Sequence, residues 1–248
     1  MKEEIYNQSH RRLNILTGEL IQVSPHRNKR PWQGQTEKVS EIKRAEYDAQ
    51  CYLCPGNDRA GGAKNPPYES TFSFVNDFGA IQEAIKIDFL EDGLLKAKSE
   101  RGICKVICFS PRHDQTLPEM ELRQIESVIK LWVDECNQLG TKDFINHVQI
   151  FENKGSVMGC SNPHPHGQIW AQETIPNEVK KKCDRQLDYY QQKGDGLLTK
   201  YLSQELKLKK RILYENNDMV VLVPYWATWP FEAMILPKKN CRTLQHYR

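Results

Sequence analysis

Two histidines separated by one proline, His164 and His166, are the residues of this chain best suited to nucleophilic chemistry. An imidazole has an unperturbed pKa of about 6.5, so at neutral pH one ring nitrogen carries a free lone pair. Pro163 and Pro165 fix their own φ angles and keep the segment extended. Alternate side chains of an extended segment point to the same side, so we expect His164, His166 and Gln168 to share one face.

A segment rich in glycine and serine leads to these histidines, Gly155-Ser-Val-Met-Gly-Cys-Ser-Asn162. Small residues leave their backbone N–H groups accessible, which is what a phosphate-binding nest requires. The alternative interpretation is a proline-rich turn with two surface histidines, and an isolated His-Pro-His would not decide between the two. The preceding small residues favour phosphate chemistry.

A Cys-x-x-Cys turn, Cys51-Tyr-Leu-Cys54, can present two thiolates to one metal ion. A redox dithiol has the same spacing, so the motif alone leaves both interpretations open. The sequence has no second Cys-x-x-Cys, and His113 and His164 are the candidates for further ligands, although His113 taken alone is a loop histidine. At this length, and in a reducing compartment, the eight cysteines are interpreted as thiols or metal ligands rather than as disulfides.

The apolar pattern predicts the elements that must position these residues. Strands are expected within 68–78, 102–110 and 147–152, in the segment that ends at Ile169-Trp170, in a hairpin over 13–23, and over 211–214, 219–223 and 233–237. Helices are expected from a Thr116–Glu119 capping box to Gly140, and over 177–193 and 197–210. The stripe of Leu122, Ile125, Val128, Ile129, Trp132 and Cys136 is assigned to the core. We expect an irregular basic loop over 24–34 and an aromatic loop over 225–232 that packs between strands.

The chain of 248 residues is long enough for one large domain or two small ones, and its net charge of +3 singles out no class of partner. The basic runs 180–182 and 207–211 fit basic helix faces better than nucleic-acid binding. No apolar run reaches the length of a membrane span, and the start Met-Lys-Glu-Glu lacks the core of a signal peptide. We therefore expect a cytoplasmic protein with neither a nucleic-acid nor a membrane partner.

The segment Gly159-Cys-Ser-Asn-Pro-His-Pro-His-Gly-Gln-Ile-Trp170 resembles the signature of the galactose-1-phosphate uridylyltransferases, a branch of the histidine-triad superfamily. The superfamily pattern His-x-His-x-His has Gln168 in its third place here, which marks the transferase branch. The resemblance covers about residues 11–239. It implies an α+β, histidine-triad-like fold with a mainly antiparallel sheet flanked by helices. It also implies an N-terminal domain over 1–176 and the start of a second, related domain over 177–248. Because the family's second half continues beyond this length, we expect a truncated product whose second half is incomplete.

The resemblance also implies the functional residues. His166 would be the nucleophile, Gln168 would hydrogen-bond the phosphoryl oxygens, and the main-chain carbonyl of His164 would set the tautomer of His166. A structural zinc ion would be held by Cys51, Cys54, His113 and His164. Substrate would be bound by Arg27, Asn28, Lys29, Arg30, Ala60, Phe74, Asn76, Asp77, Asn153, Gly159, Ser161 and Gln168.

Within this set, Asp77 would bind the ribose hydroxyls, and Ala60 and Phe74 would line a uracil pocket. The basic loop with Arg27 and Arg30 would reach the active site of a neighbouring subunit, whereas composition alone is explained by two solvated arginines. The family's second metal site uses a glutamate whose position here is Lys182, so that site is not expected.

The implied activity is exchange of a uridylyl group between UDP-glucose and galactose 1-phosphate, by ping-pong kinetics through a uridylyl-histidine, in a family that forms homodimers. The alternative is an inactive, zinc-stabilised nucleotide-binding remnant that lacks the C-terminal third. A nucleotide hydrolase or dinucleotide phosphorylase on the same scaffold is a third hypothesis, which Gln168 disfavours.

Overall fold

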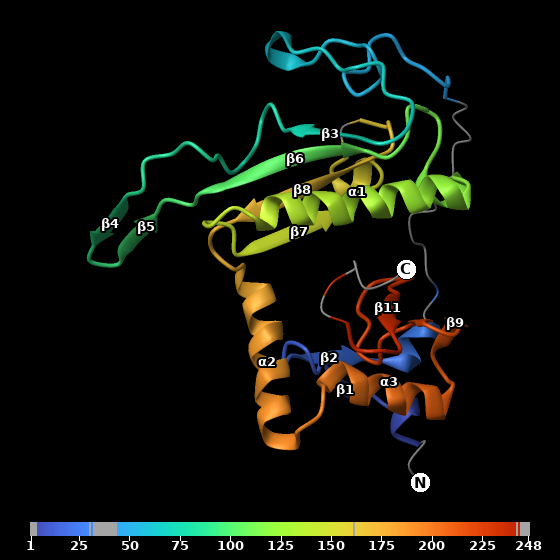
Figure 1. Cartoon of the computed structure of the whole chain (residues 1–248). Coiled ribbons are helices and arrows are strands. Elements are labelled where there is room, and N and C mark those ends of the chain that lie inside the picture. The colour runs from blue at the N-terminus through green and yellow to red at the C-terminus, as the bar shows by residue number, and fades with distance from the viewer. Residues whose placement is uncertain (1–3, 30, 32–43, 161, 242, 244–248) are drawn as a thin grey trace. The chain divides into compact units, whose positions relative to one another are not determined.

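The computed structural model describes residues 4–29, 31, 44–160, 162–241 and 243 (Figure 1). The chain divides into two compact units, Met1–Lys38 together with Pro176–Arg248, and Val39–Ile175. The N-terminal residues therefore group with the C-terminal part in this division, and the domain boundary after residue 176 that the resemblance implies stays a prediction. Arg30 and Ser161, two of the predicted substrate-binding residues, lie outside the described residues.

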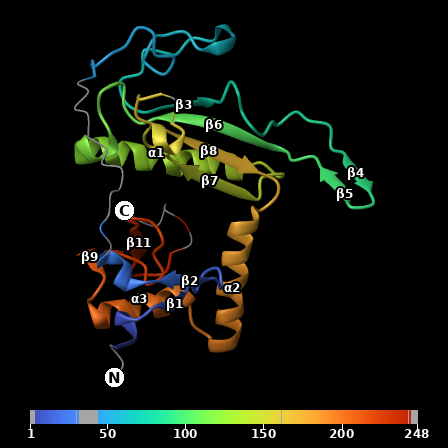
Figure 2. The ribbon, with the colours of Figure 1, turned by 180° about the vertical axis from the view of Figure 1, so that it is seen from behind.

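The unit Val39–Ile175 is built on a four-stranded antiparallel sheet, which Figure 2 shows from behind. The strand order is β3 (Phe72–Val75), β6 (Gly102–Cys108), β8 (His166–Gln172) and β7 (His147–Phe151). The strand predicted within 102–110 is confirmed as β6, which pairs with β3 on one side and with β8 on the other. Six of its seven residues are buried, as its largely apolar sequence favours.

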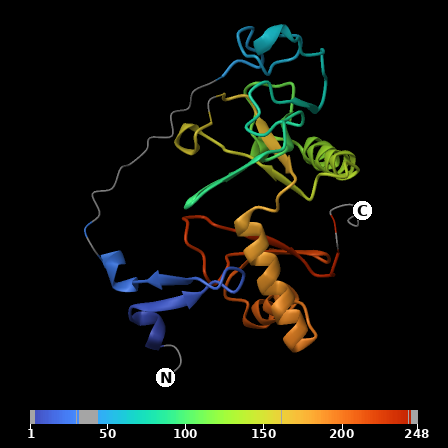
Figure 3. The ribbon, with the colours of Figure 1, turned by 90° about the vertical axis from the view of Figure 1, so that its left-hand side faces the viewer.

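One face of this sheet is covered by helix α1 (Leu122–Gly140), seen end-on in Figure 3. The face carries Ile103, Ile107 and Ile169, which pack against Val128 and Leu139 of the helix. On the opposite face, the cysteine turn packs against side chains of β3 and β6, in a cluster of Cys51, Leu53, Cys54, Phe74, Val106 and Cys108. The sheet thus separates a helix-covered core from the surface that carries the predicted site.

The start of the long helix differs from the prediction. The capping box of Thr116 and Glu119 is present, but it encloses the short 3₁₀ helix η4 (Leu117–Glu119). A second capping box, made by Glu121 and Gln124, starts α1. The predicted end at Gly140 is confirmed.

The predicted core stripe of α1 is wrong at two positions. Leu122 is 78% exposed and Ile129 is 41% exposed. The buried positions are Val128, Glu135 and Leu139, with Trp132 packed edge-on against Phe109. Ile129 lies about 100° around the helix from Val128 and therefore off this stripe. The buried Glu135 accepts two hydrogen bonds of 2.6 Å from Lys105 Nζ on β6, so an ion pair occupies part of the stripe.

A hairpin that the sequence pattern does not predict extends from this unit, formed by β4 (Phe89–Asp92) and β5 (Leu95–Lys98) (Figure 1). All eight strand residues are exposed, so neither strand shows the apolar alternation that marks a half-buried strand. The dipeptide Asp92-Gly93 was the available signal, since Asp-Gly favours tight hairpin turns.

The other unit begins with the short 3₁₀ helix η1 (Glu4–Asn7). The predicted hairpin follows, with strands β1 (His10–Leu13) and β2 (Leu20–Val23), so the first strand ends where the predicted segment begins. The 3₁₀ helix η2 (Pro25–Lys29) follows, where an irregular basic loop was predicted.

The C-terminal part of this unit contains α2 (Asn177–Lys193), α3 (Leu197–Leu208) and an antiparallel sheet in the order β11 (Met234–Pro237), β10 (Met219–Leu222) and β9 (Ile212–Glu215). These elements confirm the predicted helices and strands. Leu202 of α3 packs with Val220, Leu222 and Leu236 of the sheet. In the aromatic loop only Trp226 is buried, while Trp229 is 77% exposed and Phe231 is fully exposed, so the predicted packing is wrong for the last two. Among the described residues no helix is both long and apolar enough to cross a membrane.

Candidate active site and metal centre

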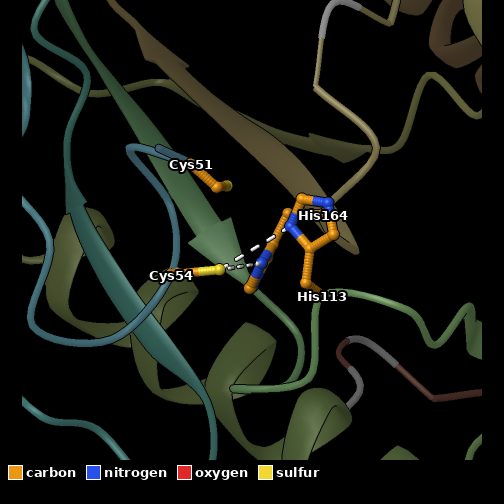
Figure 4. A group of neighbouring side chains, drawn as sticks. All are labelled: Cys51, Cys54, His113 and His164. Carbon is orange, nitrogen blue, oxygen red and sulfur yellow. Dashed lines mark hydrogen bonds between the residues drawn. The ribbon is translucent and has the colours of Figure 1, made fainter. Parts of the chain in front are cut away.

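The two cysteines and two histidines of the predicted ligand set lie together (Figure 4). They come from the Cys51–Cys54 turn, from the loop after β6, which carries His113, and from the segment before β8, which carries His164. All four side chains are buried, and their ligand atoms lie within 4.8 Å of one another. Cys54 Sγ is 3.5 Å from His164 Nδ1 and 3.6 Å from His113 Nδ1. This Cys2His2 cluster can hold a metal ion.

Burial sets the protonation of the cluster. It lowers the pKa of His164 to about 4 and also lowers the pKa of His113, so both imidazoles are neutral at pH 7 and offer a lone pair. Burial raises the pKa of Cys54 to about 11. The thiol therefore keeps its proton until a cation displaces it, and metal binding must release protons.

Hydrogen bonds around the cluster orient its members. His164 Nε2 donates to the carbonyl oxygen of Ser110 at 2.9 Å, which leaves Nδ1 free to face Cys54. Asn162 Nδ2 donates to Cys51 Sγ at 3.4 Å, and Asn162 Oδ1 accepts from the backbone N–H of His164 at 2.9 Å. Asn162 thus connects the cysteine turn to the histidine segment. It is not among the predicted site residues, because no local sequence pattern marks such a bridge.

His166 is held by its neighbour two residues earlier. Its Nδ1 atom donates to the main-chain carbonyl oxygen of His164 at 2.7 Å, the contact that the family resemblance implies. A proton on Nδ1 leaves the lone pair on Nε2. β8 begins only at His166, so the alternation of side chains along a strand does not apply to His164. The ring of His164 lies in the Cys2His2 cluster.

Two cavities meet at His166. The first, about 350 Å³, is lined by Tyr52, Leu53, Ala60, Phe74, Asn76, Asp77, Phe78, Val106, His166 and Gln168, and is termed the Phe74 cavity. The second, also about 350 Å³, is lined by Arg44, Thr116, Glu152, Lys154, Gly155, Ser156, Cys160, residues 162–165 and His166, and is termed the Lys154 cavity. Five of the predicted substrate-binding residues, namely Ala60, Phe74, Asn76, Asp77 and Gln168, share the first cavity with His166.

Strand register explains the floor of the Phe74 cavity. Phe74 of β3 pairs with Val106 of β6, and Val106 pairs with Gln168 of β8, so the three side chains form one row across the sheet. Gln168 Oε1 accepts a hydrogen bond of 3.3 Å from Trp170 Nε1. With its oxygen engaged, the amide of Gln168 presents N–H donors to the cavity.

The Lys154 cavity has a mixed electrostatic character. Arg44 and Lys154 bring positive charge, whereas Glu152 brings a carboxyl group. Burial raises the pKa of Glu152, and the nearby Lys154 and His166 oppose that shift. None of these three charged residues was predicted to belong to the site.

The glycine-rich segment beside this cavity contains the 3₁₀ helix η5 (Ser156–Met158), flanked by Gly155 and Gly159 with φ of 87° and 78°. The backbone N–H groups of Met158 and Gly159 donate to carbonyl oxygens within the segment. The predicted phosphate-binding nest therefore offers fewer free donors than expected, because the 3₁₀ turn uses them. Asn153 is exposed, two residues after the end of β7. Arg27, Asn28 and Lys29 lie in η2 of the other unit.

Two family models and several curated relatives match this chain. A family model described as the N-terminal domain of galactose-1-phosphate uridyl transferase matches residues 1–176, and the model of the C-terminal domain matches residues 182–247. The galactose-1-phosphate uridylyltransferase of Haemophilus influenzae is 49% identical, over 95% of this chain and 67% of the relative. That of Saccharomyces cerevisiae is 43% identical, over 97% of this chain and 69% of the relative.

Solved structures share the fold. A uridylyltransferase structure superimposes with a TM-score of 0.68 and 24% identity, over 94% of this chain and 66% of that one. An ADP-glucose phosphorylase from Arabidopsis thaliana superimposes with a TM-score of 0.72 and 22% identity, over 97% of this chain and 72% of that one. The α+β, histidine-triad-like fold expected from the sequence is thereby confirmed. The chain spans about two thirds of the length of the relatives it matches. By sequence and by fold, the chain belongs to the galactose-1-phosphate uridylyltransferase family of nucleotidyltransferases.

Proposed function

We propose that this chain transfers a uridylyl group from UDP-glucose to galactose 1-phosphate through a covalent intermediate on His166. The observation that carries the proposal is the position of His166, which lies between two cavities with Nδ1 engaged by the His164 carbonyl. An imidazole that is held at Nδ1 keeps its lone pair on Nε2, and at the junction of two cavities it is suited to attack on phosphorus.

The first half-reaction follows from that geometry. Nε2 of His166 attacks the α-phosphorus of UDP-glucose, an N–P bond forms, and the bond between the α-phosphorus and the bridging oxygen breaks. Glucose 1-phosphate leaves with that oxygen. In the second half-reaction a phosphate oxygen of galactose 1-phosphate attacks the same phosphorus, the N–P bond breaks, and UDP-galactose is released. The imidazole regains its free lone pair.

The two cavities fit the two halves of such a substrate. The Phe74 cavity offers an aromatic wall for a base and the polar Asn76 and Asp77 for a ribose. Arg44 and Lys154 give the other cavity positive charge suited to a sugar phosphate. Gln168 lies beside His166 in the Phe74 cavity, where its N–H groups can donate to the oxygens of the transferred phosphoryl group.

Zinc is the metal that the Cys2His2 cluster fits best. A tetrahedral zinc ion with Zn–S bonds of about 2.3 Å and Zn–N bonds of about 2.05 Å would hold its sulfur and nitrogen ligands about 3.5 Å apart. The two separations between Cys54 Sγ and the histidine nitrogens are 3.5 and 3.6 Å. Four protein ligands leave no open position, so the ion would be structural and would fix the segment that carries His166.

The remaining predicted contacts belong to the same proposal. Arg27, Asn28, Lys29 and Arg30 would supply charge and hydrogen bonds to substrate from a partner subunit of a homodimer. Asn153, Gly159 and Ser161 would contact the phosphates. A cytoplasmic location fits an enzyme that acts on nucleotide sugars and sugar phosphates.

The test is the mass of the intact protein after brief incubation with UDP-glucose, without and then with galactose 1-phosphate. We expect a gain of one uridylyl group that disappears on addition of the second substrate, with UDP-galactose as the product. A folded, metal-loaded protein that acquires no adduct would instead be the nucleotide-binding remnant. Release of free UMP without galactose 1-phosphate would indicate a hydrolase.

A further inference from the structure

Arg59 is a nearly buried cation without full hydrogen bonding. It follows the cysteine turn and precedes the 3₁₀ helix η3 (Ala60–Gly62). Its side chain is 14% exposed. The Nε and Nη1 atoms are buried and have no hydrogen-bond partner in the part of the chain that the structure describes. Leaving two donors of a buried guanidinium unpaired is costly, so the arrangement calls for a partner.

Two contacts connect Arg59 to the Phe74 cavity, although it does not line that cavity itself. Its guanidinium carbon lies 4.0 Å from the centre of the Phe74 ring, a cation–π contact. Its Nε lies 3.7 Å from Asp77 Oδ2. At that distance the two groups form an ion pair, but they are too far apart for a hydrogen bond. A shift of the carboxylate by about 0.8 Å would bring them within hydrogen-bond distance. Phe74 and Asp77 both line the cavity, so Arg59 supports two of its walls from behind.

We propose that Arg59 is a positioning residue that orients the Asp77 carboxylate toward the ribose hydroxyls of the nucleotide and thereby selects ribose over 2′-deoxyribose. This inference rests on the proposed function, in which the Phe74 cavity takes the uridine. In the bound state one oxygen of Asp77 accepts from the hydroxyls, and the other accepts from Arg59 Nε. The planar guanidinium, held against Phe74, fixes the plane of the carboxylate.

The preference for ribose follows from the free-energy cost of leaving a polar group in the site without a hydrogen-bond partner. A site built to accept hydrogen bonds from a hydroxyl strongly rejects the analogue that lacks it, because the acceptor is then left without a partner. The acceptor must be held in place for this cost to arise. Asp77 has a side chain that is 25% exposed, so without Arg59 it can turn to water and the missing hydroxyl costs little.

The experiment compares the binding of UDP and 2′-deoxy-UDP by calorimetry, with no turnover required. The wild-type protein should prefer UDP. Arg59→Met keeps an apolar stem on Phe74 but removes the cation, and we expect the preference for UDP to fall about tenfold while affinity for 2′-deoxy-UDP changes less than about twofold. Arg59→Lys keeps the charge without the planar fork and should give an intermediate preference.

Arg101 provides a matched control. Its guanidinium carbon also stacks on an aromatic ring, 3.8 Å from the centre of Phe144, and it lines neither cavity at His166. Arg101→Met should leave the preference for UDP unchanged. In an Asp77→Asn background, Arg59→Met should produce no further loss of preference, because the residue through which Arg59 acts has lost its charge.

Each outcome of these binding measurements supports or overturns the role proposed for Arg59. A loss of affinity that is equal for UDP and 2′-deoxy-UDP would overturn the inference and assign Arg59 to packing alone. A preference retained in both Arg59 variants would overturn it while leaving the proposed function intact. If Arg59→Met does not fold, Arg59→Lys carries the comparison. A folded wild-type protein that does not bind UDP would overturn both proposals.

Discussion

The Nδ1 atom of His166 lies 2.7 Å from the main-chain carbonyl oxygen of His164, while the side chain of His164 belongs to the buried Cys2His2 cluster. One residue therefore joins the candidate metal centre to the imidazole that faces both cavities. Movement of His164 must change the orientation of His166, since only Pro165 separates them. This coupling gives a structural metal a way to affect chemistry without touching the substrate.

Replacing His166 by Gly should abolish the uridylyl adduct and reduce transfer activity by at least about 10⁴-fold, since no other imidazole occupies that position between the cavities. The fold should persist, because His166 is only partly buried. Adduct mass and circular dichroism check the two parts. His26→Gly, an exposed histidine of the other unit, is the matched control and should keep the adduct. Label that remained on the His166→Gly protein would contradict the assignment.

Removal of the metal, or Cys51→Ser, should lower stability more than it changes the chemical step. The four ligands come from three segments of the chain, so an ion would join the cysteine turn to the loops that flank β6 and β8. We expect a loss on the order of 3–5 kcal/mol in the free energy of unfolding, measured with urea on protein of known zinc content. Cys183→Ser, at an exposed position on α2, should change stability by less than about 0.5 kcal/mol. An unfolding midpoint that did not move after complete chelation would refute a structural metal.

The sequence predicts the strands and helices of this chain better than it predicts which of their side chains are buried. β6 follows from its largely apolar run of residues, and the end of α2 follows from the glycine at Gly194. The β4–β5 hairpin was missed because its residues are exposed on both faces and carry no alternation. Leu122 and Ile129 were misassigned because a stripe fitted to apolar residues ignores Glu135, which is buried through its ion pair with Lys105.

The site was predictable only in part, for a physical reason. Cys51 and Cys54 are close in sequence, and their spacing indicates either a metal-binding turn or a redox dithiol. By residue type His113 was only a candidate ligand, and the family resemblance was what assigned it to the metal site. Asn162, Trp170 and Arg59 act through contacts with distant segments or neighbouring side chains, and such contacts have no spacing signature.

Glu152→Gln should make the protein more stable at pH 7 and leave stability nearly unchanged at pH 4. Burial raises the pKa of Glu152, so the folded state disfavours its ionised form. A raised carboxyl pKa contributes stability below the unfolded pKa of about 4.3 and loses it as pH rises through the folded pKa. The glutamine removes that loss, so we expect the thermal midpoint to rise by about 1–3 °C at pH 7.

Glu119→Gln is the control of opposite sign. Hydrogen bonds from Thr116 lower the pKa of Glu119, so its ionised form is favoured in the folded state. Its substitution should lower the midpoint at pH 7, with a smaller loss at acidic pH. If the thermal midpoint of each variant changed by the same amount at pH 7 and at acidic pH, packing rather than ionisation would dominate at these positions.

Gly167→Ala should destabilise the sheet strongly, although it adds only one methyl group. A Cβ atom at Gly167 would lie 2.8 Å from Phe109 Cζ and 2.8 Å from the carbonyl oxygen of Phe151. Neither neighbour can move freely, because Phe109 is buried in the core against α1 and the carbonyl belongs to the adjacent strand β7. We expect a cost of about 2–4 kcal/mol in urea unfolding, together with reduced adduct formation, since the strain falls between His166 and Gln168.

Gly140→Ala is the comparison that separates strain from the general effect of adding a methyl group. The position ends α1 and is exposed, and a Cβ atom added there would meet no described atom within 4 Å beyond its own helix backbone and chain neighbours. Alanine there should be neutral or should stabilise the protein by up to about 1 kcal/mol, because glycine is the weaker helix former. If both substitutions changed stability equally, the close approach of β8 to Phe109 would not be what requires glycine between the two functional side chains.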